Sequence, residues 1–124
     1  MANLISWKNN KVLEDGCGGL LYKVFDVENS HVKNIEIAMC IFNPGEIADL
    51  HYHDIMEEIY FFIEGEGEIE LNGMWHKVKA EDSVAIPVKT KHRIHNTSKD
   101  KPLRFLSINS PHWRETDMIR TTPN

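Results

Sequence analysis

Residues 45–65 of this chain read GEIADLHYHDIMEEIYFFIEG. His51 and His53 stand two positions apart, so in a β-strand both imidazoles point to the same face, roughly 6.6–7 Å apart along the chain. Glu58 begins the next strand-like run, and a connection over residues 54–57 lets its carboxylate return beside the two imidazoles. The segment therefore predicts two neighbouring strands that aim three potential metal ligands at one point.

Short segments enriched in Ile, Val, Phe and Tyr alternate with turn residues on both sides of this stretch. Asn72-Gly73 is a strong signal for a two-residue hairpin. A single open sheet of this size would leave its edges and one apolar face exposed, so we expect an all-β jelly-roll barrel. The expected strands span residues 20–25, 33–42, 49–53, 57–64, 67–71, 74–78, 83–86, 92–96 and 103–109.

Only the C-terminal tail shows a helical pattern. Residues 113–119 follow Ser110-Pro111 and are expected to form a short helical or irregular segment. The length of 124 residues suits one domain, and no linker or internal repeat divides it. The sequence therefore predicts a single domain over residues 1–124, with its core barrel at about residues 20–110.

The composition argues against several classes of partner. With 14 Lys and Arg against 19 Asp and Glu the formal net charge is -5, and the longest basic patch is Lys89, Lys91 and Arg93. Nucleic acids and anionic membranes are therefore not expected as partners. No apolar run reaches the ~18–20 residues of a membrane span, and residues 1–11 lack the pattern of a leader peptide. A cytoplasmic location is expected.

A fourth candidate ligand lies in a later strand. His92, one of seven histidines, follows a turn that contains Pro87 and begins an expected strand, which a jelly roll can place beside the first. Three imidazoles and one carboxylate suit a divalent transition metal and leave two positions of an octahedral ion open. Glu57 is the alternative carboxylate, but strand alternation puts Glu58 on the same face as Tyr60 and favours Glu58.

These spacings resemble the two motifs of the cupin superfamily. The first motif, G-x5-H-x-H-x4-E-x6-G, is matched at every fixed position over residues 45–65. The second motif, G-x5-P-x-G-x2-H-x3-N, is matched at three positions over residues 81–96, whereas Glu81 and Lys89 stand where the family has glycines. The matching residues are Gly45, His51, His53, Glu58 and Gly65 in the first motif, and Pro87, His92 and Asn96 in the second.

The resemblance implies a double-stranded β-helix with one divalent ion, Fe, Mn, Zn or Ni, held inside it by four residues of the motifs. These ligands would be His51, His53, Glu58 and His92. Gly65 and Pro87 would serve turns, and Asn96 would support the second motif. A surface turn at Glu81 tolerates the loss of glycine, whereas Lys89 can alter the turn just before His92.

Such a site implies an enzyme that acts on a small polar molecule. The ion can act as a Lewis acid, as in isomerases and lyases, or activate O₂, as in dioxygenases. Tyr60 and His112 are the candidate catalytic residues for proton transfer. The alternative is a non-catalytic ligand-binding or sensor protein with a structural metal. A small-molecule substrate and, because small cupins commonly pair, a second copy of the chain are the expected partners.

The remaining polar residues have simpler interpretations. His31, His76 and His95 do not fit the ligand set and are expected at the surface. The alternating acidic residues are expected to form a solvated strand face that also blunts the edge of a sheet. They are Glu64, Glu66, Glu68 and Glu70.

Overall fold

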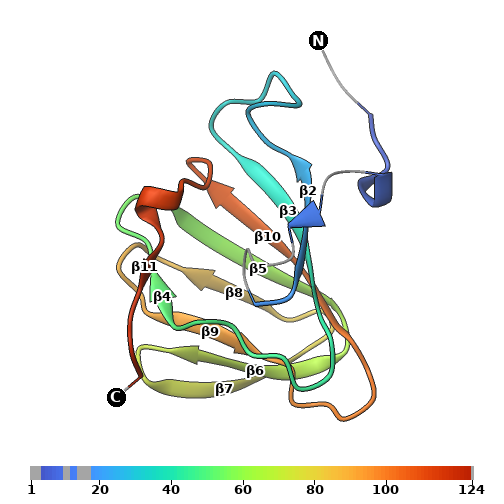
Figure 1. Cartoon of the computed structure of the whole chain (residues 1–124), viewed down its shortest axis with the longest axis vertical. Helices are drawn as coiled ribbons and strands as arrows, with labels where there is room; N and C mark the ends of the chain where they lie inside the picture. Colours follow the sequence, from blue (N-terminus) through green and yellow to red (C-terminus); the bar gives the residue numbers. More distant parts are fainter. Residues whose placement is uncertain (1–3, 10–11, 14–17, 124) are drawn as a thin grey trace.

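The computed structural model describes residues 4–9, 12–13 and 18–123. Its strands form two antiparallel sheets that face each other (Figure 1). The first sheet contains β1 (Val12–Leu13), β2 (Leu20–Phe25), β3 (Glu36–Phe42), β10 (Leu103–Ser110), β5 (Glu57–Glu64) and β8 (Ser83–Ile86), in that spatial order. The second contains β11 (Ile119–Arg120), β4 (His51–Tyr52), β9 (His92–His95), β6 (Glu66–Leu71) and β7 (Met74–Lys79). Two 3-10 turns, η1 (Trp7–Asn9) and η2 (Glu115–Asp117), complete the described elements.

The expected all-β jelly roll is confirmed, and three strands begin and end where the sequence predicts. These are β2, β5 and β8. β3 starts later than expected, at Glu36, and the strand expected over residues 49–53 is reduced to β4. Asn72 and Gly73 join β6 to β7 with φ angles of 48° and 90°, the positive values that a two-residue type I′ hairpin requires.

The tail over residues 113–119 is irregular, which is the second of the two expected possibilities, and its helical pattern does not produce an α-helix. Only one 3-10 turn, η2, forms there, and the chain then extends as β11, which pairs with β4 through Ile119 and Tyr52 (Figure 1). A helix over these residues would leave that edge of β4 without backbone partners. Pairing with the sheet therefore outweighs the local helical pattern.

The interior of the barrel changes from apolar to polar along four of the strands, as their inward-facing residues show. Along β10, the buried side chains run from Leu103 and Phe105 to Ser107 and Asn109. Three other strands follow the same gradient, from Phe62 to Glu58 on β5, from Phe42 to Glu36 on β3, and from Ile94 to His92 on β9. The phenylalanines pack at the apolar end, where Phe105 lies 5.7 Å from Phe42 and 5.2 Å from Phe62 between ring centroids.

The acidic residues of β6 do not blunt an edge, because β6 is paired on both sides, with β7 and β9. The expectation of a solvated strand face is also wrong for Glu70, which is buried. Its Oε1 accepts a hydrogen bond from Nε of Arg93 at 2.7 Å, and the Arg93 guanidinium lies over the ring of Trp75. Glu64 and Glu66 are exposed as expected.

No helix among the described residues is long and apolar enough to cross a membrane.

Candidate metal centre

Four potential metal ligands meet at the polar end of the barrel. One ligand atom from each of His51, His53, Glu58 and His92 lies within 4.8 Å of the others, and all four side chains are buried. His51 faces His92 directly in the register of β4 and β9, and their ring centroids are 4.3 Å apart. Glu58 reaches the cluster from the opposite sheet, so the two layers of the fold bring the group together.

Each imidazole is oriented by a backbone carbonyl. Nδ1 of His51 donates to the carbonyl of Asp49 at 2.7 Å, and Nδ1 of His92 donates to that of Thr90 at 2.8 Å. Nδ1 of His53 donates to the carbonyl of Asp117, also at 2.8 Å. Because a carbonyl can only accept, each neutral ring carries its proton on Nδ1 and presents the lone pair of Nε2. This is the tautomer of a metal-ligating histidine whose other nitrogen is tied down.

The lone pairs converge on Glu58. Nε2 of His53 and Nε2 of His92 each lie 3.0 Å from Oε1 of Glu58. Within the described chain, Oε1 of Glu58 and Nε2 of His92 are nonetheless buried without a hydrogen-bond partner. Electron-pair donors held this close in a buried site require a cation or a shared proton between them. The nitrogen and oxygen donor set therefore fits a divalent transition metal ion.

The charges of the cluster suit a cation. Burial and the neighbouring His92 lower the pKa of His51 to about 4, so this imidazole is neutral at neutral pH. Burial would raise the pKa of Glu58, but the adjacent imidazoles of His53 and His92 outweigh it and hold that pKa well below its usual range. Burial would likewise lower the pKa of His53, yet the adjacent Glu58 carboxylate raises it.

The turn before His92 keeps its geometry despite the missing glycines. Lys89 has a φ of 65° and Glu81 a φ of 78°, both in the left-handed region that glycine favours. The backbone N–H of Lys89 donates to the carbonyl of His53 at 2.6 Å. The expected alteration at Lys89 is therefore not found, because the lysine adopts the glycine-like conformation and ties this turn to the ligand strand.

The C-terminal tail supports the cluster through Asp117. Its buried carboxylate accepts the backbone N–H groups of Asp54 and Ile55 at Oδ1 and of Met56 at Oδ2, at 2.9 to 3.0 Å. These three residues lie in the connection between His53 and Glu58. Sequence reasoning missed Asp117, because its partners are backbone groups that leave no signal in the sequence.

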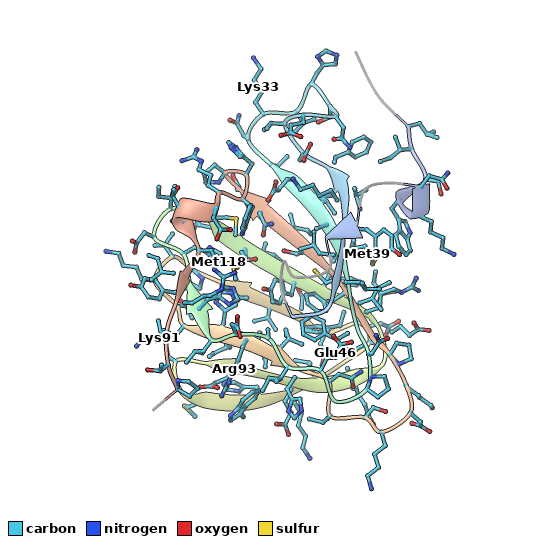
Figure 2. The ribbon with its side chains drawn as sticks, in the orientation of Figure 1. Lys33, Met39, Glu46, Lys91, Arg93 and Met118 are labelled. Atoms are coloured by element: carbon cyan, nitrogen blue, oxygen red, sulfur yellow. The ribbon has the colours of Figure 1, made fainter. Side chains whose placement is uncertain are left out.

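A cavity of about 70 Å³ opens beside the cluster and is lined by His51, His53 and Glu58, but not by His92. Its remaining wall is mostly apolar, and the tail contributes Trp113 and Met118. Met118 is labelled in Figure 2.

Tyr60 and His112, the candidate catalytic residues, differ in where they lie. Tyr60 is buried in the wall of the cavity, with its ring 6.1 Å from that of His92. His112 is half-buried and is not among the described residues that line the cavity. Of the other histidines, His31 and His76 are exposed and His95 is half-buried. Three further polar residues of the wall, Glu36, Ser107 and Asn109, were missed, although Ser107 and Asn109 continue the inward alternation of β10.

Known proteins share both the sequence pattern and the fold. Residues 38–109 match the family model of the cupin domain. An uncharacterized protein of Methanocaldococcus jannaschii is 36% identical over 81 residues, which are 65% of this chain and 64% of that protein. The polyketide synthase CurC of Streptomyces cyaneus is 32% identical over 75 residues, 60% of this chain and 48% of CurC. The chain thus matches less than two thirds of the length of these relatives.

The structure of the polyketide cyclase RemF from Streptomyces resistomycificus superposes with a TM-score of 0.83 at 17% identity. The match covers 100% of this chain and 88% of RemF. At that identity the likeness concerns the fold alone. The family model covers more than half of the sequence and includes all four residues of the cluster. This chain belongs to the cupin family.

Proposed function

We propose that this chain is a divalent-metal-dependent enzyme that acts on a small substrate bearing carbonyl or hydroxyl oxygens, with isomerase, lyase or cyclase chemistry. One observation carries the proposal: four buried potential ligands converge beside a mostly apolar cavity, and two of their ligand atoms, Oε1 of Glu58 and Nε2 of His92, lack a hydrogen-bond partner. A divalent ion bound there would supply Lewis-acid polarisation of a substrate oxygen. His51, His53, Glu58 and His92 would hold it.

The chain prepares this site before any ligand arrives. Backbone carbonyls hold the three Nδ1 atoms, so the Nε2 atoms need no reorientation. Apolar side chains such as Leu21, Phe25 and Met118 line the cavity and limit its water content. A low local dielectric strengthens each electrostatic contact with the substrate.

Tyr60 is the residue that we propose for proton transfer to or from the substrate. Its side chain lies in the cavity wall beside Glu58, on the same face of β5. The ring packs 4.7 Å from that of Phe105, which restricts where the hydroxyl can lie. Replacing Tyr60 by Phe removes only the hydroxyl, so unchanged turnover of Tyr60→Phe would exclude this role. The corresponding role of His112 stays a prediction.

The names of two similar proteins support a carbonyl substrate. CurC is a polyketide synthase and RemF a polyketide cyclase by name. Polyketide chains carry repeated carbonyl groups, whose neighbouring C–H bonds become acidic when the oxygen is polarised. The same activation of a C–H bond next to a carbonyl would serve an isomerase or a lyase.

Elemental analysis of protein purified without added metal tests the site. Wild type is expected to carry close to one divalent transition metal ion per chain, and His51→Ala and His92→Ala to lose it. His76→Ala is the matched control, because His76 is exposed and outside the cluster. Full metal content in both cluster variants would contradict the proposal.

Deuterium exchange tests the chemistry. Pyruvate, acetoin and oxaloacetate carry C–H bonds next to a carbonyl, and their loss of proton signal in D₂O can be followed by NMR. The metal-loaded wild type is expected to accelerate exchange of at least one of them, and His92→Ala to lose the effect. If the metal-loaded protein leaves all three at the uncatalysed rate, the ion does not polarise such carbonyls.

The homodimer expected from the sequence stays a prediction, as does the cytoplasmic location. Sedimentation equilibrium is expected to give twice the chain mass of 14.4 kDa. A single species of one chain mass at all concentrations would contradict the homodimer.

A further inference from the structure

A second polar feature lies in the cavity wall, apart from the ligand cluster. Glu36 is the first residue of β3 and faces Asn109 in the register of β3 and β10. Nδ2 of Asn109 donates to Oε1 of Glu36 at 3.1 Å. The backbone N–H of Trp113 donates to the same oxygen at 2.7 Å. One carboxylate oxygen of Glu36 is therefore fully engaged in holding the strand and the tail together.

The other oxygen of Glu36 has no such partner. No donor in the described part of the chain reaches Oε2, although Glu36 is only 9% exposed and lines the cavity. Oε2 is not among the fully buried side-chain atoms that lack a partner, so it stays open to the cavity, where a ligand donor can take the place of water. The free oxygen thus favours a ligand that brings a donor.

The wall between Glu36 and the cluster also presents acceptors. Because Nδ2 of Asn109 donates to Glu36, its Oδ1 is turned towards Ser107. The Ser107 hydroxyl has one proton, and its shorter contact, 3.0 Å, is with this Oδ1. The same hydroxyl also lies within donating distance of Oε2 of Glu58, at 3.3 Å, so the two acceptors share its one proton. Three hydrogen-bond contacts therefore connect Glu36 with the ligand cluster along a wall rich in acceptors.

The rest of the cavity offers little that competes for a donor group. Leu21, Phe25 and Trp113 present apolar surface. Asp26 also lines the cavity, but its Oδ2 is 3.3 Å from Nζ of Lys23 and its Oδ1 accepts two backbone N–H groups. Among the carboxylates that line the described cavity outside the ligand cluster, Glu36 thus has an oxygen available to a ligand.

We propose that Glu36 is a substrate-binding residue, which accepts a hydrogen bond at Oε2 from a hydroxyl or ammonium group of the ligand. The inference rests on the proposed function, because the opposite end of the ligand binds at the metal cluster. It narrows the substrate class to molecules with a metal-binding oxygen at one end, a short apolar middle, and a hydrogen-bond donor at the other.

Glu36→Gln separates this role from the structural one. The Gln carbonyl oxygen can still accept from Asn109 and Trp113, so the tail stays in place. The cavity then receives an amide donor instead of a carboxylate acceptor, which reverses the chemistry of that wall. Glu64→Gln is the matched control. Glu64 is exposed and lies outside the cavity lining, and this substitution removes the same negative charge as Glu36→Gln.

The experiment uses zinc-loaded protein and alkyl hydroxamates with two to five methylene groups, which end in either a methyl or an ammonium group. Acetohydroxamate reports binding of the hydroxamate head alone. Isothermal titration of wild type and Glu64→Gln is expected to show, at the best chain length, about tenfold tighter binding of the ammonium probe than of its methyl partner. Glu36→Gln is expected to lose this preference while its zinc content and its affinity for acetohydroxamate stay unchanged.

Each other result counts against the inference. Equal binding of both tails to wild type, at every chain length, overturns it even if Glu36→Gln fails to fold. The same preference in Glu36→Gln as in wild type places the donor elsewhere in the cavity and also overturns it. If acetohydroxamate itself fails to bind zinc-loaded wild type, the proposed function fails, and the inference fails with it.

Discussion

His53 donates a hydrogen bond from Nδ1 to the backbone carbonyl of Asp117, 64 residues further along the chain, at 2.8 Å. The carboxylate of the same aspartate accepts three backbone N–H groups from the connection between His53 and Glu58. One tail residue therefore orients one ligand and holds the loop that leads to another. The tail is part of the site, although it contributes no ligand to the cluster.

Asp117→Asn should weaken both metal binding and the fold. The Asn side chain keeps one acceptor oxygen, but its amide turns a donor towards the N–H of Met56, which loses its partner. We expect a loss of about 1–3 kcal/mol in the free energy of unfolding, measured in urea without metal. Zinc affinity, from competition with a chelating dye, should fall about 10- to 100-fold.

Glu115→Gln is the control for this tail prediction, because Glu115 is exposed and its carboxylate makes only a 3.6 Å contact with Arg120. Glu115→Gln should leave both the free energy of unfolding and the zinc affinity within error of wild type. Zinc affinity of Asp117→Asn equal to that of wild type would show that the tail does not position His53.

Glu58→Gln should abolish tight metal binding, whereas Glu57→Gln should leave it intact. Glu58 faces the cluster and Glu57 faces solvent, as the alternation of β5 dictates. The substitution keeps the size of the side chain and removes the negative charge that the ion would meet. We expect zinc affinity to drop at least about 100-fold in Glu58→Gln by dye competition. A comparable drop in zinc affinity in Glu57→Gln would mean that Glu57, rather than Glu58, faces the metal.

The spacing of the ligands and the alternation of β5 account for most of the site residues that could be predicted from the sequence. Inward Glu58, Tyr60 and Phe62 follow from the two-residue period of a strand, and His51 and His53 from the same rule. β11, by contrast, is two residues long and too short for any periodic signal. It forms because β4 offers an unpaired edge, which no local pattern in the tail reveals.

Cross-strand contacts and turn conformations account for the remaining differences. Glu70 is outward by alternation yet buried, because Arg93 and Trp75 face it across the two neighbouring strands. Such coverage depends on register, which the sequence does not state. At Lys89, the motif retains its turn because a non-glycine residue can adopt a left-handed φ at a cost of about 1–2 kcal/mol.

Gly65→Ala should destabilise the protein far more than Gly73→Ala. Both glycines have positive φ, 86° and 90°, so both variants bear a similar conformational strain. A Cβ at Gly65 would lie 2.2 Å from the backbone oxygen of Pro102, whereas a Cβ at Gly73 meets nothing within 4 Å. We expect a loss of about 1 kcal/mol for Gly73→Ala and at least about 2 kcal/mol more for Gly65→Ala in urea unfolding. Equal losses would show that strand β10 can move away from this turn.

The stability of the metal-free protein should depend on pH through His51. Its pKa is lowered from 6.5 to about 4, foremost by burial and then by His92, so the unfolded chain binds a proton that the folded chain does not. The stability that this group contributes is present above pH 6.5 and is lost as the pH falls towards 4. His53, whose pKa is raised, acts in the opposite direction, so the His51 contribution must be isolated by substitution.

His51→Gln removes the titrating group and isolates this contribution. We expect the free energy of unfolding of wild type, relative to His51→Gln, to fall by up to about 3 kcal/mol between pH 7 and pH 4.5. Urea unfolding with a chelator present measures both proteins at each pH. His76→Gln, at an exposed position, should run parallel to wild type. Parallel curves for His51→Gln as well would mean that His51 takes up its proton in the folded protein, which its burial beside two other imidazoles should prevent.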